Sequence, residues 1–140
     1  MDRVMIQGCL VKYEYLWANN TIIAKDAFKD NHGKKIPVFE SMDFPDAGDL
    51  IGRAEIENHD DGVYYTLYLN DSDKAHEVFA EILDDMLEWH IGLYANRIRR
   101  EGGRVLKGNI LAGGFDKRVD GSSYIEKIIC GDISQNLQGT

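Results

Sequence analysis

The stretch AEIENHDDGVYYTLYL, residues 54–69, constrains the fold more than any other part of the chain. Apolar residues alternate with other residues on both sides of an Asp60-Asp61-Gly62 turn, a pattern typical of a β-hairpin. The following Asn-Asp-Ser, residues 70–72, offers oxygens that can cap the start of a helix. After residue 72, apolar residues recur every three or four positions and predict one amphipathic helix. Its continuous apolar stripe is made of Ala75, Val78, Phe79, Ile82, Leu83, Met86 and Leu87.

Strands are predicted on both sides of this unit, because β-branched and aromatic residues are concentrated there. Residues 4–16 are predicted to form the opening strand, with Gly8 as a candidate bulge. Residues 35–40 and 51–57 have the same kind of composition and are also predicted to be strands. A second hairpin is expected around Glu101-Gly102-Gly103, and YIEKIIC gives a last strand. The order of elements predicts a β-rich α+β domain, with a barrel-like antiparallel or mixed sheet and one main helix.

The length and composition favour one domain. A chain of 140 residues with 44% hydrophobic residues can bury one sizeable core, and no linker or repeat divides it. We expect this domain to span residues 1–133 and the polar tail, residues 134–140, to be frayed. Cys9 and Cys130 lie in apolar strand-like contexts, so buried thiols are expected rather than a disulfide framework.

The charge and hydropathy of the chain limit its partners. The formal net charge is −8, and one short basic cluster, Arg97, Arg99, Arg100 and Arg104, is interpreted as a solvated face, which argues against nucleic-acid binding. The first residues, MDRVMIQG, do not resemble a secretory signal, and no apolar run approaches the ~18 residues needed to span a bilayer. We therefore expect a soluble, intracellular protein that does not bind membranes.

Chemical motifs are scarce. The four histidines, His32, His59, His76 and His90, have no metal-ligand spacing, and phosphate-binding glycine patterns are missing, so neither a metal nor another cofactor is expected. His59 is predicted to be exposed at the hairpin tip, and His76 to lie on the polar side of the helix. His90, where the helix meets a strand, is interpreted as a partly buried boundary residue, with a ligand or base role as the alternative.

Read in order, several segments together resemble the tailed-phage prohead protease family, in the form common in phages of Gram-positive bacteria. The resemblance runs from about residue 6 to residue 128 through IQGCLVKYEY, IIAKDAF, KKIPVFESMD, IGRAEIE, DDGVYYTLYLND, the helix and IGLYANRIRREGGRVLKGNI. It implies a fold like that of herpesvirus assemblins. It also implies a serine nucleophile activated by a histidine, with a third polar residue on a later strand.

The catalytic residues of that family are replaced here. Met42, before Asp43, stands where the resemblance places the histidine, and a thioether cannot accept a proton from a hydroxyl. Gly92 takes the place of the serine, or His90 does if the chain is aligned on Ile-Gly, and Ala112 takes the place of the acidic residue. Loss of nucleophile and base removes most triad catalysis, so we favour an inactive descendant over an active enzyme.

The resemblance leads to three hypotheses. The first is a non-catalytic capsid-assembly or virion component that binds copies of itself and phage capsid proteins, located in the host cytoplasm during phage assembly or in the virion. The second is an active prohead serine protease with a relocated site, recruiting Ser41 with His90 or His32. The third is a phage-encoded inhibitor or binding module that acts on a host factor.

Overall fold

The computed structural model describes residues 4–16, 20–43, 48–117 and 124–130, so the predicted frayed tail, residues 134–140, lies outside the described residues. Within these ranges the chain forms eight strands, one α-helix and two short 3₁₀ turns. The helices are α1 (Asp73–Asp84), η1 (Lys29–Asn31) and η2 (Met86–Glu88). The strands are β1 (Val4–Lys12), β2 (Ile22–Ile23), β3 (Lys35–Phe39), β4 (Leu50–His59), β5 (Gly62–Leu69), β6 (Trp89–Glu101), β7 (Arg104–Lys117) and β8 (Tyr124–Cys130).

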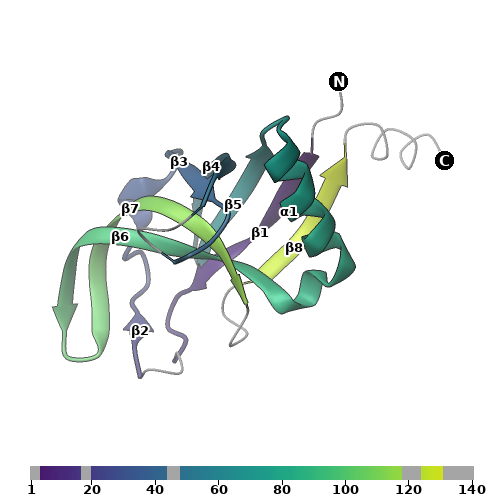
Figure 1. Ribbon diagram of the computed structural model, residues 1–140. Coiled ribbons are helices and arrows are strands. Elements are labelled where there is room, and N and C mark those ends of the chain that lie inside the picture. The colour runs from purple at the N-terminus through teal and green to yellow at the C-terminus, as the bar shows by residue number, and fades with distance from the viewer. Residues whose placement is uncertain (1–3, 17–19, 44–47, 118–123, 131–140) are drawn as a thin grey trace.

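The strands form one curled, mixed sheet, as the α+β prediction requires (Figure 1). Its order is β2-β7-β3-β4-β5-β1-β8, with β6 paired to β7. β7 is antiparallel to β6 but parallel to β2 and β3, which occupy different parts of its length. The long β6–β7 hairpin bends away from the body of the sheet and ends on the side opposite α1 (Figure 1).

Both predicted hairpins are confirmed. β4 and β5 pair from Gly52↔Leu69 to His59↔Gly62, and β6 and β7 pair from Trp89↔Lys117 to Glu101↔Arg104. The register between β1 and β8 shifts between Gln7 and Gly8, in agreement with the bulge expected at Gly8. The opening strand is shorter than predicted: β1 ends at Lys12, and a turn follows in which Glu14 adopts a φ of 56°.

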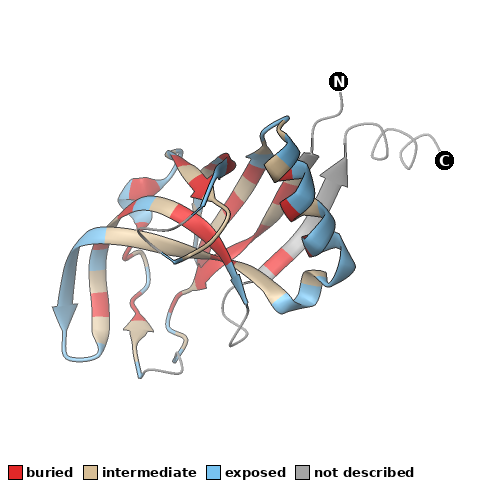
Figure 2. Ribbon diagram, viewed as in Figure 1, coloured by how far each residue is buried: buried red, intermediate tan, exposed pale blue. Residues whose placement is uncertain are grey.

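The core lies inside the curl of the sheet, where residues from all eight of these strands and α1 pack together (Figure 2). Ala75, Val78 and Ile82 carry the apolar side of α1 into this core. The prediction of one continuous stripe was wrong at its end, because Leu83 is 54% exposed and Leu87 is 71% exposed. The α-helix stops at Asp84 and the chain tightens into η2, so the spacing of three and four no longer keeps one face turned inward.

Other side-chain predictions are confirmed. Cys9 is a buried free thiol, whereas the side chain of Cys130 lies outside the described residues. His59 is exposed beside the β4–β5 turn and stacks on Tyr64, and His76 is exposed on α1. No helix among the described residues is long and apolar enough to cross a membrane.

The start of α1 depends on one side-chain cap, which gives a first prediction. The Ser72 hydroxyl accepts a hydrogen bond of 3.2 Å from the Ala75 amide. We expect Ser72→Ala to lower the free energy of unfolding by about 1 kcal/mol, because this amide loses its partner. Urea titration followed by circular dichroism measures the change. Ser72→Asp keeps an oxygen acceptor and should retain most of the stability, and equal losses in the two variants would contradict this role.

Candidate functional site

Two facing glycines on β6 and β7 form a flat patch that the segment after β3 crosses. Gly92 and Gly114 are direct partners in the β6–β7 ladder. A Cβ atom on Gly114 would lie 2.4 Å from the carbonyl oxygen of Ser41, and one on Gly92 would lie 2.9 Å from both Cε and Sδ of Met42. The backbone of Ser41 and the side chain of Met42 therefore rest directly on the sheet, and this close approach requires residues without side chains.

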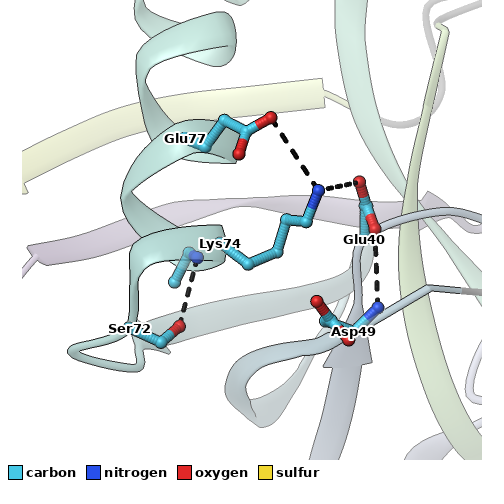
Figure 3. Close-up of polar contacts among 6 residues, drawn as sticks. Glu40, Asp49, Ser72, Lys74 and Glu77 are labelled. Atoms are coloured by element: carbon cyan, nitrogen blue, oxygen red, sulfur yellow. Dashed lines mark hydrogen bonds and ion pairs between the residues drawn. The ribbon is translucent and has the colours of Figure 1, made fainter.

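Polar contacts hold this crossing segment in place. The Tyr94 hydroxyl donates a hydrogen bond to the carbonyl oxygen of Met42. The Glu40 amide donates to the carbonyl oxygen of Asp49 at 2.9 Å, which closes the loop that carries the segment. The Glu40 carboxylate pairs with Lys74 of α1 at 3.2 Å, and the hydrogen bond to Glu40 raises the pKa of Lys74 (Figure 3). This ion pair connects α1 to Glu40, directly before the segment that crosses the two glycines.

The three positions that the resemblance assigns to catalysis lie on one face of the β6–β7 ladder. Met42 contacts Gly92, as described above. Ala112 is paired with Tyr94, two residues from Gly114, so it shares the face on which Met42 rests. His90 is two residues before Gly92 on the same strand and is partly buried, in agreement with its interpretation as a boundary residue.

The side chains at these positions cannot perform triad chemistry. A thioether, a glycine and a methyl group offer no proton acceptor, no nucleophile and no orienting carboxylate. The Ser41 hydroxyl accepts a hydrogen bond from the Asp43 amide at 3.0 Å, and among the described residues it has no hydrogen bond to His90 or His32. His32 accepts from the Asn58 amide and is separated from Ser41 by the whole of β3, roughly 13 Å of strand.

A cavity of about 300 Å³ opens beside Met42 and Gly92, between β6 and the ends of β1 and β2. Three polar residues line it, Thr21, His90 and Arg100. The rest of the lining is mostly apolar and includes Leu10, Ile23, Phe28, Ile91, Ile98 and Val105. Such a cavity suits an apolar group with a polar or charged end.

No family model, curated protein or solved structure matches this chain. The prohead protease resemblance therefore remains a prediction, and the geometry of the site stands on its own. Within the described part of the chain, no group of three or more His, Cys, Asp or Glu side chains could hold a metal ion. What the site offers chemically is an apolar cavity with a cationic edge.

The cavity is the feature that the sequence did not predict. Arg100 was assigned to a solvated basic cluster, and it is exposed, but it also lines the cavity. Arg104 of the same cluster is instead paired with Glu14 at 2.8 Å. One signal was present in the sequence: Ile98 interrupts the run of arginines, and a single apolar residue in a basic strand indicates that one side of the strand faces an apolar surface.

Proposed function

We propose that this chain is a non-catalytic phage protein with a prohead-protease-like fold, acting as a capsid-assembly or virion component. The contact between Met42 and Gly92 carries the proposal. The resemblance assigned these residues to the base and the nucleophile from distant parts of the sequence, and a base must lie within reach of its nucleophile. Their contact in the folded chain meets this requirement and so supports the assignment.

The position of Ala112 gives further support. It lies on the strand that pairs with Gly92, and on the face where Met42 rests. A third catalytic residue that orients a base is expected close to it and on a different strand from the nucleophile. The shared face agrees with the arrangement that the resemblance implies, and a thioether, a glycine and a methyl group cannot perform triad chemistry.

Binding is the role that remains for such a site. The Met42 side chain occupies the space that a side chain at residue 92 would need, yet the adjoining cavity of about 300 Å³ stays open. A fold can keep its surfaces while its function changes. The resemblance supplies the class of partner, namely the capsid proteins on which the protease family acts, and host cytoplasm during phage assembly as the place.

The test is to mix the purified protein with the major capsid protein encoded in the same phage genome. We expect the two proteins to co-elute from a sizing column and the mass of the capsid protein to stay intact. We also expect no labelling of the chain by a serine-directed fluorophosphonate. Cleavage of the capsid protein that is lost in Ser41→Ala would contradict the proposal and support the relocated protease. Separate elution without cleavage would contradict the assembly role.

A further inference from the structure

The end of α1 presents an apolar surface surrounded by carboxylates, here called the acidic knob and defined by Leu83, Asp84, Asp85, Leu87 and Glu88. Leu83 and Leu87 are 54% and 71% exposed. Asp84 and Asp85 are exposed beside them, and burial together with the nearby Glu88 raises the pKa of Asp85. Lys117 pairs with Glu88 at 3.4 Å, so the carboxylates of Asp84 and Asp85 carry the remaining negative charge of the knob. Exposed apolar patches of this kind mark interaction sites.

The cavity beside Gly92 has the complementary character. Its outer part is formed by Ile98, which is 40% exposed, and by Arg100. Among the described residues, Arg100 has no carboxylate within ion-pair distance, whereas Arg104 and Lys107 of the same hairpin are paired with Glu14 and Asp30. The cavity therefore combines an apolar interior with a cationic edge.

The two surfaces have opposite charge, and each has an apolar part. They are also neighbours along the chain, because Glu88 of the acidic knob is two residues before His90, which lines the cavity. Figure 1 shows the β6–β7 hairpin extending away from the side of the molecule where α1 lies. Leu83 and Leu87 are exposed, so the chain does not fill its own cavity with its own acidic knob. Figure 2 shows the exposed outer face of α1 and the exposed end of the hairpin. A second copy is the one partner known to carry the complementary surface, because every copy carries both.

We propose that copies of this chain associate head to tail, with Leu83 and Leu87 of one copy entering the cavity of the next and Asp84 and Asp85 facing Arg100. Such a contact joins two different surfaces, so copies can pair reciprocally or continue into a ring or an open chain. The inference rests on the proposed function in that both treat the cavity as a binding site, and it names the occupant.

The test measures the weight-average mass of the isolated protein by sedimentation equilibrium over a wide range of concentration, without capsid protein. We expect the mass to rise with concentration for the native chain. Leu87→Ala removes an exposed side chain, so it should leave the fold intact and weaken association about tenfold, because an apolar contact is lost. Leu111→Ala, at an exposed leucine of β7 outside the knob and the cavity, should leave association unchanged.

Charge reversal gives a second, independent arm. Arg100→Glu should weaken association about tenfold or more, because it places a carboxylate opposite the acidic knob. Arg99→Glu makes the same change on a neighbouring residue that does not line the cavity, and we expect a smaller effect. Mixing the Arg100→Glu chain with a chain carrying Asp84→Arg and Asp85→Arg should restore association between the two.

Three results would overturn the inference: a monomer at all concentrations, association that Leu87→Ala and Arg100→Glu leave unchanged, or equal weakening by Arg99→Glu and Arg100→Glu. A monomeric chain that still binds capsid protein would reject the head-to-tail contact and keep the proposed function. Self-association together with cleavage of the capsid protein would keep the head-to-tail contact and reject the proposed non-catalytic function. The two proposals therefore fail by different measurements.

Discussion

Replacing Asn31 with alanine is expected to lower the free energy of unfolding by about 3 kcal/mol, because three buried hydrogen bonds to backbone groups, those of Phe28, Gly108 and Ile110, are lost. The Asn31 side chain is buried, with the residue 3% exposed, and its amide nitrogen donates to the carbonyl oxygen of Gly108 at 3.0 Å. Its amide oxygen accepts from the Ile110 amide at 2.9 Å. One side chain thus joins η1 to β7, beside a single backbone hydrogen bond of 3.3 Å from the Gly108 amide to the carbonyl oxygen of Ala27.

Urea titration followed by circular dichroism gives the size of this effect, and Asn96→Ala is the matched control. Asn96 is exposed on β6 and accepts a hydrogen bond from the Asn109 side chain at 2.8 Å. Removing an exposed hydrogen bond of this kind should change the stability by no more than about 0.5 kcal/mol. Similar losses in the two variants would show that the burial of Asn31 does not matter.

Gly114→Ala is expected to destabilise the fold by about 3 kcal/mol and Gly92→Ala by about 1 kcal/mol, although the two glycines face each other. A Cβ on Gly114 would meet the backbone of Ser41 at 2.4 Å, and that backbone is fixed by the Glu40–Asp49 hydrogen bond. A Cβ on Gly92 would meet the flexible end of the Met42 side chain at 2.9 Å, which can turn away.

The same titration separates the two cases, and a second substitution tests the cause. Met42→Ala introduced together with Gly92→Ala should cost less than the sum of the two single changes, because the methionine that obstructs the new Cβ is gone. No such relief is expected when Met42→Ala is combined with Gly114→Ala, since the obstruction there is backbone. Equal costs at the two glycines would contradict the crossing of Ser41 and Met42 over this patch.

Local elements of the fold could be predicted from the sequence because their signals are local. The alternation around Asp60-Asp61-Gly62 specifies a hairpin by itself, and Ser72 before an apolar stripe specifies where a helix begins. Both are observed. The glycines at residues 102 and 103 likewise indicated the second hairpin, in which Gly102 adopts a φ of 59° that favours glycine.

Contacts between distant segments could not be predicted in this way. The parallel pairing of β3 with β7 joins Val38 to Gly113, and neither residue carries a signal for the other. Asn31 stands in a polar turn sequence, where an asparagine predicts an exposed turn rather than a buried link. Leu83 and Leu87 fitted the helical period, but where a helix stops depends on the packing of the whole chain.

The residues of the candidate site could be predicted in part, whereas the cavity beside them could not. Resemblance to a family selected Met42, Gly92 or His90, and Ala112, because a resemblance compares whole motifs. Met42 and Gly92 are in contact in the fold. The cavity beside them depends on the curl of the sheet, which brings Leu10 of β1 near Ile98 of β6. No spacing along the chain encodes that distance.

The pairing of β7 has a consequence for how the protein folds during its synthesis on the ribosome. β2 and β3 precede β7 in the chain, so they leave the exit tunnel before the strand with which they pair in parallel. β1 pairs with β5 and also with β8, which follows the other described strands in the chain. A nascent chain can close the β4–β5 hairpin early, but it carries unpaired strand edges until β7 and β8 have been translated, and aggregation can begin at such edges.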